Sequence, residues 1–204
     1  MSLKSKAKAI CQKCGHEHTV EIYKSINTAT DPDLKAAVIS GEAFLWECPH
    51  CGTSNLAAYE CLFHDPDARY MVWMLPFGEP EGPEKDAIMN QTRAMGDYRL
   101  RIVNNAGDLM EKVIIFDAGL DDRCIELVKY VAGNELEGVT NLHFYRMQDD
   151  VMVFSALKAG KMEGFGFGFN VYEDCRGIIG RNPEIAREEG FSHVDADWVA
   201  SILK

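Results

Sequence analysis

Two pairs of cysteines have the residue type and the spacing of a metal site. In each pair, two residues separate the cysteines and a glycine follows at once; the four are Cys11, Cys14, Cys48 and Cys51. Two sulfurs on one tight turn can reach the same ion, and four thiolates are a donor set typical of tetrahedral zinc. The sequence therefore predicts that these four cysteines bind one structural zinc ion.

A closed four-thiolate site limits the chemistry that is available. It leaves no open coordination position, so we expect no hydrolysis at the ion and assign no catalytic or other cofactor-binding residue. Redox chemistry is the alternative, because Cys48-Pro49-His50-Cys51 matches the active-site tetrapeptide of some thioredoxin-fold oxidants. Such a thiol is activated by a helix N-terminus, whereas the residues after Cys51 favour a turn. The motif therefore favours zinc.

Histidines beside the cysteine pairs are further candidate ligands. His16, His18 and His50 could replace a cysteine or bind a second ion. Because four thiolates already complete a tetrahedral site, we expect these imidazoles to face solvent.

A second polar group could perform acid–base chemistry. His64 and Asp65 are followed by Pro66 and Asp67, and a turn explains the aspartates and the proline completely. The alternative function for the chain is a hydrolase-like enzyme with an acid/base site around His64 and Asp65 at a cleft between its two parts. These residues leave open whether the protein is an enzyme, and the absence of a nucleophile–base arrangement favours a protein that is not one.

The elements that must position the cysteines follow from the surrounding residues. The predicted elements are a strand over residues 17–23, a helix over 32–40, a strand over 43–47 and a hairpin of strands 56–63 and 70–75. We interpret residues 1–76 as a zinc-ribbon domain with an inserted helix.

The rest of the chain is predicted to form a second domain. Proline, glycine and glutamate dominate residues 76–84, so residues 77–97 are expected to be a linker or loop. Residues 98–204 are predicted to be an α+β domain with an antiparallel sheet. Its expected elements are a strand over 98–103, a helix over 108–116 opened by a capping box at Asp108–Glu111, a helix from Asp121 or Asp122 to 132, strands over 142–147, 151–157 and 164–172, and a helix from Asp195.

Glycine and phenylalanine alternate along Gly164–Phe169. In a strand, the phenylalanines occupy one face and the glycines leave the other face bare. Strand residues rather than a helix are expected to follow, which argues against a dinucleotide-binding loop. Core packing is the default interpretation, and a close contact with another backbone is the alternative.

The chain is acidic, with 32 Asp and Glu against 21 Lys and Arg and a net charge of −11. An acidic body repels phosphate backbones, so nucleic-acid binding is not expected, and a protein partner or self-association is. No apolar run approaches the roughly 20 residues that span a bilayer, so we expect no membrane partner and a cytoplasmic location. The lysine-rich start, with Lys4, Lys6, Lys8 and Lys13, is expected to be a mobile, solvated terminus.

Several of these motifs together resemble the CpXC domain family, which is named for its Cys-Pro-x-Cys motif. The similar stretches are Cys11–Gly15, Ser25–Asn27, Asp31–Lys35, Cys48–Gly52, Phe63–Asp65 and Ile115–Arg123, within residues 9–132. The first cysteine pair carries Gln12 where the second has Pro49; proline is not a ligand, so the departure does not affect metal binding. The resemblance implies zinc binding without an established activity. We therefore expect a non-enzymatic, zinc-binding protein-interaction module.

Overall fold

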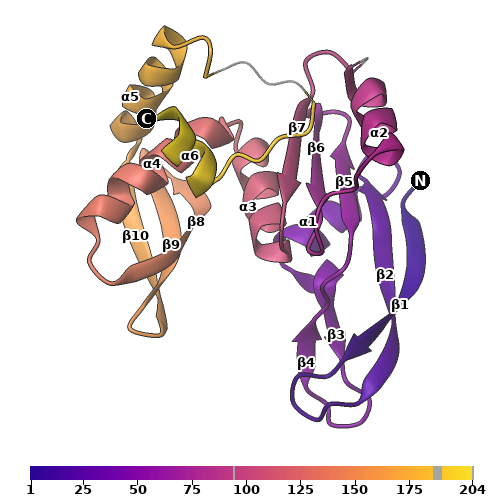
Figure 1. Ribbon diagram of the computed structural model, residues 1–204. Coiled ribbons are helices and arrows are strands. Elements are labelled where there is room, and N and C mark those ends of the chain that lie inside the picture. Colours follow the sequence, from indigo (N-terminus) through magenta and orange to yellow (C-terminus); the bar gives the residue numbers. More distant parts are fainter. Residues whose placement is uncertain (94, 186–189, 204) are drawn as a thin grey trace. The chain divides into compact units, whose positions relative to one another are not determined.

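The computed structural model describes residues 1–93, 95–185 and 190–203 (Figure 1). The chain divides into two compact units, Met1–Met110 and Glu111–Lys204, and the division falls within helix α3 (Ala106–Asp117). Each unit contains helices and antiparallel strand pairs, which confirms the predicted α+β class. Within the described ranges, every helix is too short or too polar to cross a bilayer.

A five-stranded sheet forms the centre of the first unit. In spatial order its strands are β1 (Leu3–Ile10), β2 (Glu17–Asn27), β5 (Cys61–Asp65), β6 (Tyr70–Met74) and β7 (Arg99–Val103). β2 pairs in parallel with β5, and β6 with β7; the other neighbours are antiparallel. Ile26, Phe63 and Val72 are aligned across three strands and fully buried. These residues share one face of the sheet and form part of its core.

Strand β1 corrects the expectation of a mobile, solvated terminus. Lysines alternate with small, half-buried residues along it, which is the period of a strand. Lys4 Nζ lies 2.6 Å from Glu21 Oε1, and Lys8 Nζ lies 2.7 Å from Glu17 Oε1, so both lysines pair with β2. β1 is an edge strand, where exposed lysines also discourage pairing with other chains.

A small antiparallel sheet carries the second cysteine pair. Its strands are β3 (Leu45–Glu47) and β4 (Ser54–Leu56), which follow α1 (Asp33–Ile39) and the short 3-10 helix η1 (Glu42–Phe44). The predicted strand over 43–47 therefore starts at Leu45, because η1 occupies its first residues. The predicted strand over 56–63 is divided between β4 and β5.

The stretch expected to be a linker contains helix α2 (Pro83–Arg93). Pro83 is its first residue, where a fixed φ and a missing N–H are no disadvantage. After α2, strand β7 pairs with β6 from Tyr70↔Arg99 to Met74↔Val103. Residues 99–103 therefore belong to the first sheet, and the division between the units lies after Met110 rather than within 77–97.

Helix α3 begins earlier than the predicted helix over 108–116. Asn105 Oδ1 accepts a hydrogen bond from the Asp108 backbone N–H at 2.9 Å, and Asn105 Nδ2 donates to Asp108 Oδ2 at 2.7 Å. The start of the helix is therefore stabilised by Asn105 with Asp108, and not by the predicted pair of Asp108 and Glu111. Glu111 is buried and has other partners, described below.

The second unit packs helices on a three-stranded antiparallel sheet (Figure 1). The strands lie in the order β10 (Lys161–Gly168), β9 (Val151–Lys158), β8 (Val139–Gln148), and the helices are α4 (Asp122–Glu135), α5 (Phe169–Arg181) and α6 (Ala196–Ile202). α4 contacts α5, α6 and β8. Phe144 and Phe154 are buried, with ring centroids 5.6 Å apart in an edge-to-face arrangement. The antiparallel sheet expected after residue 98 is confirmed for these three strands.

Helix α5 was missed by the sequence prediction, which continued a strand to residue 172. Tyr172, Cys175 and Ile179 are buried at helical spacing and form its inner face. A helix therefore does follow the glycine–phenylalanine stretch, and the prediction of strand residues there is wrong. The glycines of this stretch lie inside β10 as strand residues, so the stretch is still not a phosphate-binding loop.

Candidate metal centre

Two tight turns of the same construction carry the four cysteines. The first cysteine turn, residues 11–16, joins β1 to β2, and the second, residues 48–53, joins β3 to β4. In the first, Cys11 N–H donates to His16 O at 3.0 Å and Gly15 N–H donates to Cys11 O at 2.9 Å. In the second, the equivalent bonds from Cys48 to Thr53 and from Gly52 to Cys48 measure 2.9 and 2.8 Å.

The glycines are required by this turn geometry. Gly15 and Gly52 have φ values of 71° and 67°, in the left-handed region that other residues rarely adopt. Each glycine lets the chain reverse directly after the second cysteine, so that both sulfurs of a turn point to one side. The spacing in the sequence therefore encodes the local geometry of both turns.

The four cysteine sulfurs lie close together, and we call them the cysteine cluster. All four Sγ atoms lie within 4.8 Å of one another. Between the turns, Sγ of Cys11 lies 3.6 Å from Sγ of Cys51, and Sγ of Cys14 lies 3.7 Å from Sγ of Cys48. A tetrahedron with metal–sulfur bonds of about 2.3 Å has sulfur–sulfur edges of about 3.8 Å. Two of the six sulfur–sulfur separations match this edge and the others do not exceed 4.8 Å, so the cluster could hold a metal ion.

The thiols influence each other's ionisation. The backbone N–H of Cys14 lowers the pKa of Cys11, which lies at about 6 although burial opposes the change. For Cys14, the backbone N–H of His16 lowers the pKa, but burial and the neighbouring sulfurs raise it to about 12. Four sulfurs this close cannot all carry a negative charge without a cation among them. A divalent metal ion would supply that positive charge.

Polar groups outside the cluster contact its sulfurs, and the sequence did not reveal them. Asn55, only 5% exposed, has its Nδ2 3.6 Å from Sγ of Cys11. Thr53 Oγ1 lies 3.4 Å from Sγ of Cys51, and His18 Nε2 lies 3.4 Å from Sγ of Cys48. The sequence predicts only a turn over residues 52–55.

The predicted exposure of the three histidines holds for two of them. His16 and His50 are exposed, whereas His18 is half-buried. The difference arises because the His18 ring lies between the cluster and Trp46. The ring centroids of His18 and Trp46 are 5.9 Å apart.

His64 and Asp65 lie at the end of β5 and have structural partners. Asp65 is 4% exposed; its Oδ1 accepts from the Ala68 backbone N–H at 3.0 Å, and its Oδ2 lies 3.1 Å from Lys35 Nζ. His64 Nε2 lies 3.3 Å from the Tyr98 hydroxyl. Both carboxylate oxygens of Asp65 are thus engaged in fixing the turn and α1, which agrees with the turn interpretation.

The acidic residues at the start of α4 also have structural roles. Asp121 is the N-cap: its Oδ1 accepts from the Arg123 backbone N–H at 3.0 Å, and its Oδ2 lies 2.6 Å from Arg123 Nη2. Asp122 is fully buried and lies 3.0 Å from Lys112 Nζ. The predicted cap is confirmed at Asp121, whereas no local pattern predicts the buried ion pair.

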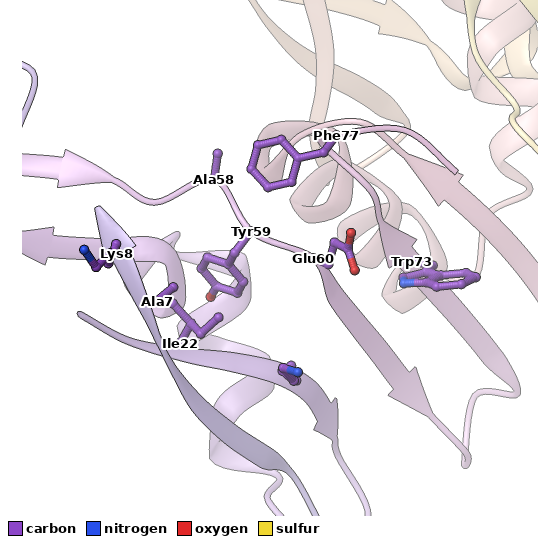
Figure 2. A pocket seen from close by; sticks show the side chains of 9 residues that line it. Ala7, Lys8, Ile22, Ala58, Tyr59, Glu60, Trp73 and Phe77 are labelled. Atoms are coloured by element: carbon purple, nitrogen blue, oxygen red, sulfur yellow. The ribbon is translucent and has the colours of Figure 1, made fainter. Parts of the chain in front are cut away.

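An open groove lies on the first unit (Figure 2). Its volume is about 360 Å³, and residues of β1, β2 and β6 and of the loops around them line it: Ala7, Lys8, Ile22, Lys24, Ala58, Tyr59, Glu60, Trp73 and Phe77. Figure 2 shows the Tyr59 ring beside Ala7 and Ile22, with Phe77 and Trp73 farther along. Phe77 is 73% exposed. The groove therefore offers aromatic surface to an apolar group.

Comparison with known proteins identifies a family. No curated protein sequence matches this chain, and no solved structure matches it. A sequence model described as "CpXC protein" matches residues 10–129. This range covers more than half of the chain and includes both cysteine turns and the whole cysteine cluster. The chain therefore belongs to the CpXC family.

Proposed function

We propose that this CpXC protein binds one zinc ion through Cys11, Cys14, Cys48 and Cys51, and that the ion is structural. The convergence of four sulfurs within 4.8 Å of one another, with two pairs at the 3.6 and 3.7 Å typical of a tetrahedral zinc site, carries this proposal. Four protein ligands leave no position for water or a substrate. The ion holds the β1–β2 turn to the β3–β4 turn, which supports folding of the first unit.

Metal analysis of the purified, metal-replete protein tests this proposal. We expect about one tightly bound zinc per chain, which the double variant Cys48→Ser, Cys51→Ser loses. Cys175→Ala, a buried cysteine of α5 outside the cluster, is the matched control and keeps its zinc. Zinc absent from the wild-type protein, or equally present in the double variant, overturns the proposal.

We further propose that the zinc-supported surface binds another protein or a second copy of this chain. Leu45 and Leu56 are cross-strand partners in the small sheet, and they are 51% and 58% exposed. Exposed apolar groups that cluster on a small module are typical of protein-interaction sites. The groove of Figure 2 adds the exposed Phe77. The net charge of −11 disfavours nucleic acid as the partner.

Self-association and partner capture are measured separately for the variant Leu45→Ser, Leu56→Ser. Light scattering after size-exclusion chromatography reports self-association, and quantitative pull-down from the native cell reports other proteins. We expect the double variant to lose the wild-type interaction, because two exposed leucines no longer provide apolar contact area. Leu203→Ser, at an equally exposed leucine after α6, is the control. Unchanged association in both assays contradicts the proposal.

The cysteines support a proposal about the compartment. None of the seven, all of which lie in the described residues, forms a disulfide, and cysteines without disulfides are typical of a reducing environment. We therefore propose a cytoplasmic location, which fractionation of the native cell would test. Enrichment in a secreted or periplasmic fraction would contradict it.

A further inference from the structure

Two exposed histidines beside the cysteine cluster form a pair. His16 ends the first cysteine turn and His50 lies within the second. Their ring centroids are 3.8 Å apart, with an angle of 44° between the ring planes, and both side chains are exposed. The same convergence of turns that gathers the sulfurs thus also places two imidazoles together on the surface.

The hydrogen bonding of His16 leaves one ring nitrogen available to a metal. Its Nδ1 lies 3.3 Å from the backbone oxygen of Cys14. A carbonyl oxygen can only accept, so Nδ1 carries the proton and donates it. In the neutral ring, Nε2 then holds an unshared electron pair. Metal-bound histidines commonly have this arrangement, with the other ring nitrogen donating to a carbonyl.

His18 has a different role from the pair. Its ring centroid lies 6.4 Å from that of His16, and its Nε2 is 3.4 Å from Sγ of Cys48. That nitrogen faces the sulfur and so is not directed at an ion held by His16 and His50. His18 is therefore a contact of the cysteine cluster and not a member of the histidine pair.

We propose that His16 and His50 bind a second divalent ion of the zinc class on the solvent side of the cysteine cluster, with water completing its coordination. The two exposed rings, in contact at 3.8 Å between centroids, must rotate apart so that one nitrogen of each faces the ion. Imidazole nitrogen is a preferred ligand of zinc, nickel and copper ions. Four thiolates around one divalent ion retain a net charge of about −2, which attracts a further cation to the neighbouring surface. This electrostatic contribution rests on the proposed function, whereas the geometry of the pair does not.

Zinc titration of the full-length protein, already loaded at the cysteine cluster, tests the second site. We expect calorimetry to show a further, weaker equivalent of zinc in the wild-type protein. His16→Ala and His50→Ala each abolish this equivalent. His193→Ala, at a half-buried histidine of the second unit, retains it. In nitrogen NMR spectra of the wild-type protein, zinc shifts the Nε2 resonance of His16 far more than its Nδ1 resonance.

The outcomes separate this proposal from that of a structural zinc. A wild-type protein that takes up no further zinc, or histidine variants that bind it as the wild type does, overturns the histidine site. Failure of the cysteine cluster to hold zinc is detected independently by the serine variants above. In that case the comparison of His16→Ala and His50→Ala with the wild type still decides the histidine site. Both histidines are exposed, so their replacement leaves the core intact.

Discussion

Asn55 connects the two cysteine turns through one amide group. Its Oδ1 accepts from the Gln12 backbone N–H at 2.9 Å, in the first turn. Its Nδ2 donates to Thr53 O at 2.7 Å in the second turn and points to Sγ of Cys11. One buried side chain therefore fixes the separation of the turns, and hence of the sulfurs that they carry.

Replacing Asn55 with alanine should loosen the metal site while leaving every cysteine in place. The Gln12 N–H loses its protein partner, which we expect to cost about 0.5–1.5 kcal/mol of stability. The proposed zinc ion should then transfer to a colorimetric chelator several-fold faster from Asn55→Ala than from the wild type. Gln148→Ala removes an exposed amide from β8 and is the control. Equal transfer rates for Asn55→Ala and the wild type would show that Asn55 does not support the site.

At this scale, the sequence predicts the cysteine cluster but not the residues around it. Cys11 and Cys48 are recognisable because each lies in a local motif whose spacing determines the turn. Asn55 follows the second cysteine turn in the sequence but contacts Cys11 of the first. His18 follows the first turn but contacts Cys48 of the second. Both contacts form only when distant segments fold together. Their residue types fit many other roles, so no local pattern marks them.

At the scale of elements, a buried group of charges joins α3 to α4 in the second unit. Lys112 Nζ lies 3.0 Å from Asp122, 3.2 Å from Glu126 and 2.6 Å from the backbone oxygen of Val194. The last contact also attaches the segment that precedes α6. Lys112 and both carboxylates are buried, so each charge depends on its partners.

Lys112→Met is expected to destabilise the second unit strongly. It retains the length and apolar character of the side chain but removes the ammonium group that lies 3.0 Å from the buried carboxylate of Asp122. Breaking a buried pair in this way costs about 3–5 kcal/mol. Chemical denaturation followed by circular dichroism measures the free energy of unfolding. Lys158→Met, at an exposed position of β9, is the control and should change this free energy little. If Lys112→Met lowers stability no more than Lys158→Met does, the ion pair of Lys112 with Asp122 is not needed for the stability of the second unit.

Protonation of Glu111, which belongs to the same group of charges, makes the stability of the fold depend on pH. Burial raises the pKa of Glu111, but Lys129 and His143 outweigh burial and lower it from 4.5 to about 2. A carboxylate with a depressed pKa stabilises the fold above its unfolded pKa, and this contribution is lost as the pH falls toward the folded pKa. The structure therefore predicts lost stability between pH about 4.5 and about 2.

Glu111→Gln tests this acid dependence, because the amide has no proton to gain. The variant should be less stable than the wild type at neutral pH, and the difference should shrink as the pH falls below about 4.5. Urea denaturation at a series of pH values measures both effects. A difference that stays constant with pH would contradict the assignment to Glu111.

The predicted elements agree with the structure where the signal is local and periodic. Alternation identified the start of β2, and a good N-cap identified α4. Helix α5 was missed because the glycine–phenylalanine alternation of β10 leads directly into it without a polar cap. Strand β1 was missed because lysine is uncommon in strands, although the ion pairs with β2 accommodate it.

At the scale of the whole molecule, the two units should respond differently to loss of metal. The cysteine cluster belongs to Met1–Met110, and no candidate ligand of that cluster lies beyond residue 51 in the described ranges. Removing the proposed zinc ion with a chelator should therefore increase amide hydrogen exchange in the cysteine turns and β3–β4. Strands β8–β10 should keep their protection. Equal loss of protection in both units would contradict this prediction.

The domain division was the least predictable property. Proline and glycine at 76–84 are typical of a boundary, but whether a strand beyond them returns to the first sheet depends on long-range pairing. The family match, residues 10–129, likewise crosses from one unit into the other. Composition marks where the chain is irregular, and it does not show which segments pack together.

Because the division falls inside α3, the two units have no exposed loop as their junction. Proteases prefer exposed loop tips, and the hydrogen-bonded backbone of a helix resists them. Limited digestion of the intact protein should therefore nick loops within a unit before it separates the two. Because β7 pairs with β6, a gene truncated at residue 97 would delete β7 and leave one edge of β6 unpaired. The proline-rich stretch is therefore not a position at which either unit can be exchanged as an independent cassette.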